Sequence, residues 1–162
     1  MIDFKNIVLT TDLSDNAAAA APYAMEMARR FGGTIHLVSI FDDSLFYASP
    51  AAADGTAIDP AEWMSISFQE RERTLATLAE SLAKEAGVPV KLVLRRGHAA
   101  TEIVNVAKDV NADCVIIATH GRTGLAHFLF GSVVERIVRF CPCPVLSIRP
   151  QAMRTDKPVP SK

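Results

Sequence analysis

The sequence predicts an open, parallel α/β sheet with helices on both of its faces. Five short runs of aliphatic and β-branched residues recur along the chain, and helical patterns lie between them. Most of these runs are continuously apolar, as expected of parallel strands buried on both faces. Because strands and helices alternate, right-handed crossovers would build one Rossmann-like sheet covered on both sides.

Each expected element is supported by its local pattern. In the first helix, alanines and Phe31 share one face, Ser14 is a candidate N-cap, and Gly32-Gly33 ends the helix. The three later helices repeat apolar residues at spacings of three, four or seven. Strands are expected at residues 7–10, 35–41, 90–94, 114–118 and 145–148, and helices at 17–31, 61–86, 99–110 and 132–140.

Two segments do not fit this alternation. Residues 42–60 are alanine-rich and have no period, and connections of that length are usually lids or disordered. Residues 150–162 carry prolines and charges but little to bury. We therefore expect one nucleotide-binding domain over residues 1–150 and a disordered tail over 151–162.

Composition narrows the class of protein. The 162 residues are 49% hydrophobic, which is enough for one domain with a full core. The 17 basic and 18 acidic residues nearly cancel, so the protein has no net electrostatic field to recruit nucleic acid or an anionic membrane. No apolar run approaches the roughly 20 residues of a membrane span. The first residues lack the cationic start and long apolar stretch of a secretion signal. A cytoplasmic protein is expected, with neither nucleic acid nor membrane as its partner.

The spacing of the three cysteines does not indicate a disulfide framework. Their odd number argues against structural disulfides. The sequence Cys141-Pro142-Cys143 could be a metal or redox motif, but it has one intervening residue where such motifs usually have two, and no histidine stands at ligand spacing. We expect small apolar residues at the junction of a helix and a strand, and no metal site.

The segment that follows the fourth expected strand is the most informative for function. After Ile117 and Ala118 come Thr119, His120, Gly121 and Arg122, and Gly131-Ser132-Val133 then opens a helix. A strand, a glycine-containing loop and a helix N-terminus together form a typical phosphate cradle, because backbone N–H groups and the helix dipole both favour an anion. The sequence therefore predicts a bound nucleotide.

Two other strand ends should meet this loop. The first strand ends in Thr10-Thr11-Asp12 and the second in Ile40-Phe41-Asp42. If the first and fourth strands are neighbours, these ends converge on one crevice, where open α/β sheets bind ligands. The carboxylate of Asp12 could accept hydrogen bonds from ribose hydroxyls or an adenine amino group, and Ile40 and Ile117 could flank a base.

Three motifs together resemble the universal stress protein family, over about residues 3–150. The first is the apolar run and Thr-Asp-x-Ser at residues 7–14, with Thr10 where proline is usual. The second is Gly-x-x-Gly, nine residues, then Gly-Ser/Thr: Gly121 and Gly131-Ser132 match it, and Ala118 replaces the first glycine. The third is the closing Cys143-Pro144-Val145-Leu146.

The resemblance implies a five-stranded sheet of order 3-2-1-4-5 and a homodimer formed partly through the fifth strands. The ATP-binding branch of the family would hold adenosine against Asp12, Ile40 and Ile117. Phosphates and ribose would lie on Gly121, Gly131, Ser132 and Val133, usually with Mg²⁺ or Mn²⁺. Another branch lacks the glycine pattern and does not bind ATP. If the methyl group of Ala118 met the ligand, it should cost about fivefold in affinity, or about 1 kcal/mol.

Alternatives remain open at several of these residues. Asp12 could simply cap a helix, and Gly131-Ser132 could be a tight turn with an N-cap. His120 and Arg122 could serve as general acid and phosphate clamp, or lie on the surface, and Thr119 could meet phosphate or satisfy the turn.

Three functions follow from these readings. They are a regulatory protein that binds ATP, ADP or AMP, a slow ATPase, and a nucleotide-free dimeric adaptor. An enzyme is not expected beyond slow hydrolysis, since no Gly-x-x-x-x-Gly-Lys-Ser/Thr loop is present.

Overall fold

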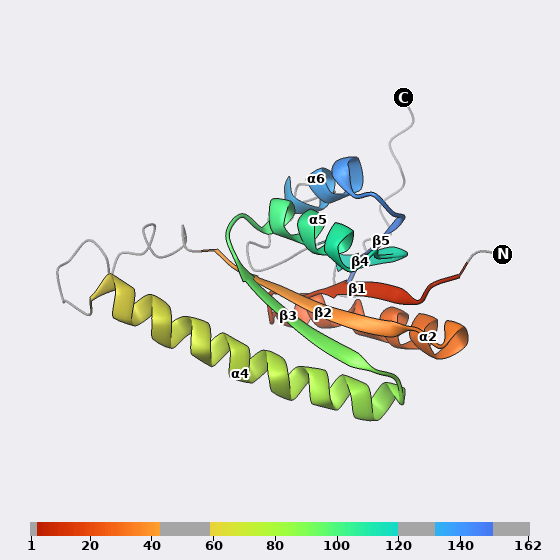
Figure 1. Cartoon of the computed structure of the whole chain (residues 1–162), viewed down its shortest axis with the longest axis horizontal. Helices are drawn as coiled ribbons and strands as arrows, with labels where there is room; N and C mark the ends of the chain where they lie inside the picture. Colours follow the sequence, from red (N-terminus) through yellow and green to blue (C-terminus); the bar gives the residue numbers. More distant parts are fainter. Residues whose placement is uncertain (1–2, 43–58, 120–131, 151–162) are drawn as a thin grey trace.

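The structure, a computed structural model, describes residues 3–42, 59–119 and 132–150. Within these ranges the chain forms one five-stranded parallel sheet of order β3-β2-β1-β4-β5 (Figure 1). The strands are β1 (Asn6–Thr10), β2 (Thr34–Phe41), β3 (Val90–Arg96), β4 (Cys114–Ala118) and β5 (Val145–Ile148). This order and the parallel pairing confirm the fold that the sequence predicts.

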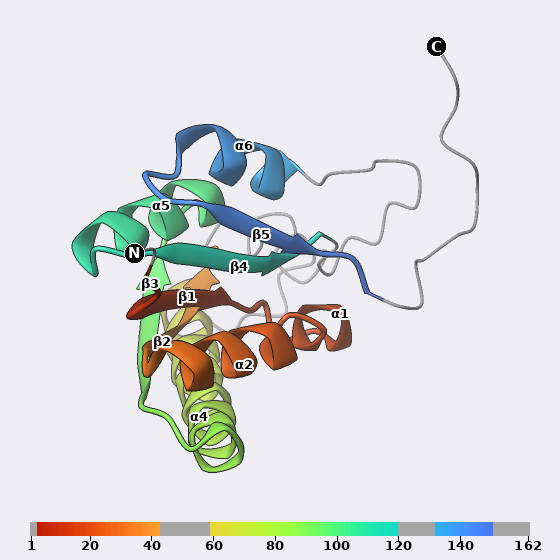
Figure 2. The ribbon, with the colours of Figure 1, turned by 90° about the vertical axis from the view of Figure 1, so that its right-hand side faces the viewer.

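Helices cover both faces of the sheet, as predicted (Figures 1 and 2). The helices are α1 (Asp15–Ala18), α2 (Ala21–Phe31), α4 (Pro60–Ala86), α5 (Ala99–Asp109) and α6 (Ser132–Phe140). The apolar side chains of α2 and α4 pack on one face, and those of α5 and α6 pack on the other. Most of the expected irregular segment 42–60, namely residues 43–58, and the expected tail 151–162 lie outside the described residues.

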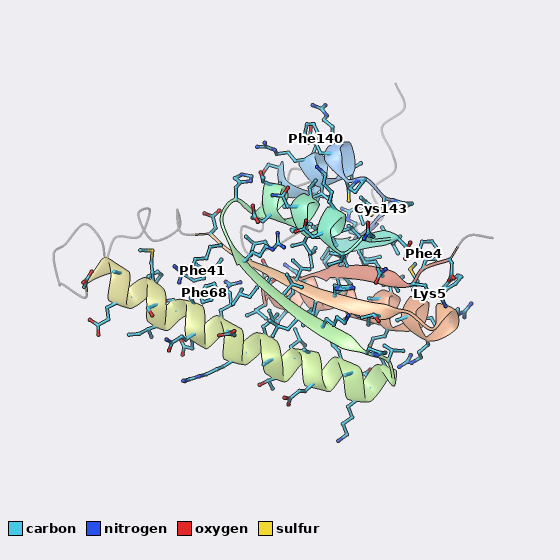
Figure 3. All side chains as sticks on the ribbon, in the orientation of Figure 1. Phe4, Lys5, Phe41, Phe68, Phe140 and Cys143 are labelled. Atoms are coloured by element: carbon cyan, nitrogen blue, oxygen red, sulfur yellow. The ribbon has the colours of Figure 1, made fainter. Side chains whose placement is uncertain are left out.

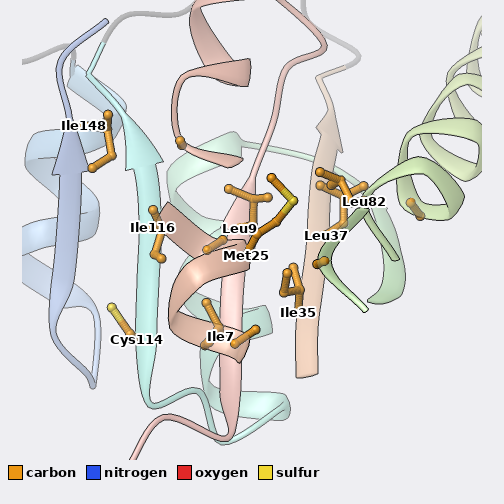
Figure 4. Packing of buried hydrophobic residues seen from close by; sticks show 14 of the residues in the cluster. Ile7, Leu9, Met25, Ile35, Leu37, Leu82, Cys114, Ile116 and Ile148 are labelled. Atoms are coloured by element: carbon orange, nitrogen blue, oxygen red, sulfur yellow. The ribbon is translucent and has the colours of Figure 1, made fainter. Parts of the chain in front are cut away.

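Two apolar clusters, one on each face of the sheet, form the core. Alternate residues of a strand point to opposite faces. In β1, Ile7 and Leu9 join the cluster under α2 and α4, whereas Val8 joins the cluster under α5 and α6. Figure 4 shows Ile7, Leu9 and Ile116 lying beside one another across the sheet. The central strands are thus buried on both faces, which explains their continuously apolar sequence.

One expected helix is divided in two. The sequence predicts a single helix over 17–31, but α1 ends at Ala18 and α2 begins at Ala21. Pro22 accounts for the break, because proline has no N–H to donate to the carbonyl group of Ala18 and its ring would collide with that group. Ser14 caps α1 as predicted: its side chain accepts a hydrogen bond from the backbone N–H of Ala17.

The glycines after α2 serve two different purposes. Gly32 has φ 61° and its N–H bonds to the carbonyl oxygen of Ala28, so it is a left-handed C-cap. A Cβ atom on Gly33 would collide with the backbone carbonyl oxygen of Phe4. The pair therefore ends the helix and also lets the chain pass close to the start of β1.

The long helix α4 is anchored at its C-terminal end. Arg29 of α2 donates through Nε to the carbonyl oxygen of Ala86 at 3.0 Å, and through Nη2 to that of Glu85 at 2.8 Å. These carbonyl groups have no partner within the helix. Arg29 thus joins the two helices that cover this face.

Candidate functional site

The chain changes direction across the sheet between β1 and β4. From β1 the chain adds β2 and β3 on one side, and then crosses to add β4 and β5 on the other. The pairing of Leu9 with Ile116 confirms that the first and fourth strands are neighbours. In open α/β sheets a ligand binds at this reversal, beyond the carboxyl ends of the strands. The three expected strand ends therefore meet at one edge of the sheet.

The turn after β1 is fixed by four hydrogen bonds. The backbone N–H of Thr11 donates to the carbonyl oxygen of Val38 at 2.9 Å, and Thr11 Oγ1 accepts from the N–H of Leu13 at 3.0 Å. Asp12 Oδ1 accepts from both the N–H and the hydroxyl group of Ser14, at 3.0 and 2.6 Å. Leu13 has φ 65°, a left-handed conformation that a leucine rarely adopts. The turn holds the Asp12 carboxylate in one position.

Asp12 has a structural role in this turn. It orients Ser14, whose hydroxyl oxygen in turn accepts from the N–H of Ala17 at 3.2 Å and caps α1. The capping alternative for Asp12 is therefore supported, acting through Ser14. A carboxylate has room for several hydrogen bonds. Contact of Asp12 with a ligand stays a prediction.

Apolar site residues line one side of this edge. Ile40, Ile117 and Val133 all pack against the cluster under α5 and α6. Thr10 follows Val8 by strand alternation, so it lies on the same face, and it is buried. The structure thus brings the two residues expected to flank a base onto a common side.

Ala118 lies on the opposite face from Ile117. Its methyl group belongs to the cluster under α2 and α4 and is 9% exposed. Its neighbour in β5 is Ile148, whose carbonyl oxygen also accepts from the N–H of Thr119 at 2.9 Å. The methyl group that replaces the first glycine of the motif is thus directed into the core.

The proposed phosphate loop is described only at its two ends. Thr119 is buried at the first end, and at the second Ser132 is exposed and opens α6. His120, Gly121, Arg122 and Gly131 lie outside the described residues. The phosphate cradle and the roles of these four residues remain predictions.

A cluster beside the end of β2 was not expected from the sequence. Arg71 of α4 donates through Nη1 to the buried hydroxyl oxygen of Ser39 at 2.9 Å, and its guanidinium carbon lies 5.8 Å from the centre of the Phe41 ring. Phe68 lies edge-on to Phe41 (Figure 3). The guanidinium carbon of Arg96 lies 4.4 Å from the centre of the Phe68 ring. Two cations are thus held close to this edge of the sheet. Only the register of α4 on the sheet brings them together.

A surface cavity lies elsewhere, between α5 and α6. It has a volume of about 280 Å³ and is lined by residues such as Asn105, Lys108, Arg136 and Phe140. None of the residues predicted for the nucleotide site contributes to it. Among the described residues, no group of three or more acidic, histidine or cysteine side chains could hold a metal ion. No helix in the same ranges is long and apolar enough to cross a membrane.

The model of the universal stress protein family matches residues 3–149. The chain belongs to this family. A curated universal stress protein of Methanocaldococcus jannaschii, MJ0531, is 32% identical over 146 residues, which cover 90% of this chain and 82% of the relative. The family match confirms the resemblance carried by the Thr-Asp-x-Ser and Gly-Ser motifs.

Solved structures of family members share the fold. The universal stress protein UspA from Lactobacillus plantarum superimposes with a TM-score of 0.76 at 23% identity, covering 91% of this chain and 99% of that one. A universal stress protein in complex with cAMP has a TM-score of 0.60 at 22% identity, and one from Archaeoglobus fulgidus in complex with dAMP has 0.60 at 21%. Both of these matches cover 91% of this chain and 98% of the chain of the solved structure.

Proposed function

We propose that this universal stress protein binds an adenine nucleotide, namely ATP, ADP or AMP, at the carboxyl edge of β1, β2 and β4. The observation that carries the proposal is the reversal between β1 and β4, where a fixed Asp12 turn and two isoleucines on one face meet at a single edge. The complexes of family members with cAMP and dAMP support the same ligand class. We propose a regulatory role in the stress response, in the cytoplasm.

Each part of the nucleotide has a proposed contact. The adenosine lies against Asp12, Ile40 and Ile117, with Thr10 and Thr11 beside it. The phosphates lie on the loop from Thr119 to the start of α6, where the helix dipole favours negative charge. Any Mg²⁺ or Mn²⁺ arrives with the phosphates, since the described residues offer no metal cluster of their own.

We also propose a homodimer through β5. Within the described part of the chain β5 pairs only with β4, so its other side is an open edge, which soluble proteins avoid exposing. Val138 and Phe140 of α6 are 55% and 58% exposed. They lie roughly 200° apart on the helix, and Phe140 lines the cavity toward α5. Val138 is thus directed away from α5, where it could be covered by a partner.

Substitution of Asp12 tests the nucleotide proposal. Asp12→Asn keeps one oxygen to accept from Ser14, so the turn and the cap of α1 persist while the charge is removed. Loss of a charge-assisted hydrogen bond should lower the affinity for ATP, ADP and AMP alike, by about tenfold, as measured by calorimetric titration. Asp12→Ala would be a poorer test, because it also removes the support of Ser14.

The matched control is Asp113→Asn. Asp113 Oδ2 accepts from the backbone N–H groups of Lys5 and Asn6, both at 2.8 Å, at the opposite edge of the sheet. This control should bind nucleotides like the natural protein. If both natural protein and control fail to bind any adenine nucleotide, and none is released from freshly purified protein, the nucleotide-free adaptor replaces our proposal.

A further inference from the structure

Two thiols lie side by side where α6 connects to β5. Cys141 Sγ and Cys143 Sγ are 3.6 Å apart and share a hydrogen bond. Both side chains are half-buried against the cluster under α5 and α6, so the packing role expected from the sequence is present. Figure 3 marks Cys143 at this connection. This end of β5 is opposite to the edge proposed for the nucleotide, so the pair has no part in that site.

The side chain of the third cysteine lies on the other face of the sheet from this pair. Cys114 is buried in the cluster under α2 and α4, on the other face of the sheet, and Figure 4 shows it directed into that core. The described residues also provide no group of three metal-ligating side chains here. The arrangement therefore fits chemistry between two thiols.

We propose that Cys141 and Cys143 form a reversible disulfide and act as a two-electron redox couple. A disulfide has an S–S length of about 2.05 Å, so the two sulfur atoms must approach by only about 1.5 Å. Residues two apart in an exposed connection can make this movement by side-chain rotation and a small change in the turn. In a reducing compartment such a bond is transient, as expected of a sensor and not of a structural link.

The oxidant is a low-molecular-weight disulfide such as oxidised glutathione. The Cys141 thiolate attacks one sulfur of the oxidant, its proton goes to solvent, and one thiolate leaves, giving a mixed disulfide. Cys143 then loses its proton and attacks Cys141 Sγ, which releases the second thiolate. The protein loses two electrons and two protons, and the oxidant becomes two thiols.

The environment of Cys143 sets the order of these steps. Burial, helped by the hydrogen bond to Cys141, raises the pKa of the Cys143 thiol to about 12. Cys143 therefore keeps its proton at neutral pH, and either sulfur atom can be the donor in the hydrogen bond between the two thiols. Because the thiolate is the nucleophile, we assign Cys141 as the thiol that attacks first and Cys143 as the one that resolves the mixed disulfide.

The test equilibrates the full-length protein with oxidised and reduced glutathione at several ratios. Samples are quenched in acid, free thiols are blocked in denaturant, and intact masses are measured. The natural protein and Cys114→Ala should both lose two hydrogen atoms and recover fully with reductant, with one free thiol left in the natural protein and none in the variant. Cys143→Ser should stop at a glutathione adduct on Cys141, while Cys141→Ser should form neither product readily.

Circular dichroism shows whether each variant is folded, so that a failure to react can be distinguished from a failure to fold. The proposal is overturned if the natural protein, folded and accessible to the oxidant, gains only glutathione adducts or shows no reaction. It is equally overturned if the disulfide forms in Cys143→Ser, or if it requires Cys114.

Discussion

Replacing Ala118 with glycine would restore the family's glycine motif, and the structure predicts an unexpected result. The methyl group of Ala118 lies in the core under α2 and α4, on the opposite face from Ile40 and Ile117. Its removal should therefore weaken the core without making room for a ligand. The fivefold gain in affinity that the sequence suggests should not occur.

The magnitude follows from two terms. Loss of one buried methyl group costs about 0.8 kcal/mol, and glycine inside a strand costs roughly 0.5–1 kcal/mol in backbone entropy. The free energy of unfolding should fall by about 1.5 kcal/mol, or roughly 3–6 °C in melting temperature for a chain of this size. Urea unfolding measures the first quantity, and calorimetric titration with ATP measures the affinity.

Ala28→Gly is the matched control. Ala28 is fully buried in the same cluster but lies in α2, away from the strand ends. Both variants should lose comparable stability and leave nucleotide affinity unchanged. Our reasoning is refuted if Ala118→Gly binds ATP about fivefold more tightly at unchanged stability, because the methyl group would then face the ligand.

Two further predictions concern the opposite edge and the open strand. His36 is buried, 3.3 Å from Asn6 Oδ1, and burial, aided by Lys91, lowers its pKa. The imidazole of His36 therefore binds a proton more tightly in the unfolded chain than in the folded protein. The free energy of unfolding, measured with urea, should fall as the pH drops below about 6.5, by at most about 1.4 kcal/mol per pH unit. His36→Gln should remove this part of the pH dependence. In β5, the carbonyl groups of Pro144 and Ile148 accept from β4, so by alternation the backbone N–H of Ser147 faces the open edge. Ser147→Pro should therefore remove an edge donor and give a folded monomer in sedimentation, while Ser147→Thr stays dimeric. A folded Ser147→Pro dimer would move the interface elsewhere.

The strands could be predicted from the sequence because a strand that is buried on both faces is apolar at nearly every position. Runs such as Cys114–Ala118 are apolar at every position and cannot be confused with an exposed loop. Period-two alternation even assigns Ala118 to the face of Cys114 and Ile116. The sequence does not reveal which helices cover that face, so the environment of the methyl group became clear only in the structure.

The divided first helix shows a conflict between two local signals. The alanines at 21, 24 and 28 continue one apolar face through the break, and this pattern predicts a single helix. Pro22 indicates the opposite, because it has no N–H to continue the helical hydrogen bonding, and the helix is interrupted before it. The hydrogen bonds that Ser14 donates to Asp12 are equally local and could be predicted from the sequence, since aspartate commonly accepts from the backbone two residues further on.

The contact between Arg71 and Ser39 could not be predicted. The two residues are 32 positions apart, and no periodic pattern connects them. Only the register of α4 on β2 brings the guanidinium group to the buried hydroxyl oxygen. Long-range polar contacts of this kind depend on packing that a single sequence does not encode in any local spacing.

Amide hydrogen exchange with and without saturating ATP tests the central claim most directly. We predict slower exchange in peptides that contain residues 10–14, 40–42 and 117–119 and the start of α6, and no change at 141–144. Unchanged exchange at the three strand ends, or protection confined to the cavity between α5 and α6, would contradict a nucleotide site at the edge where β1, β2 and β4 end.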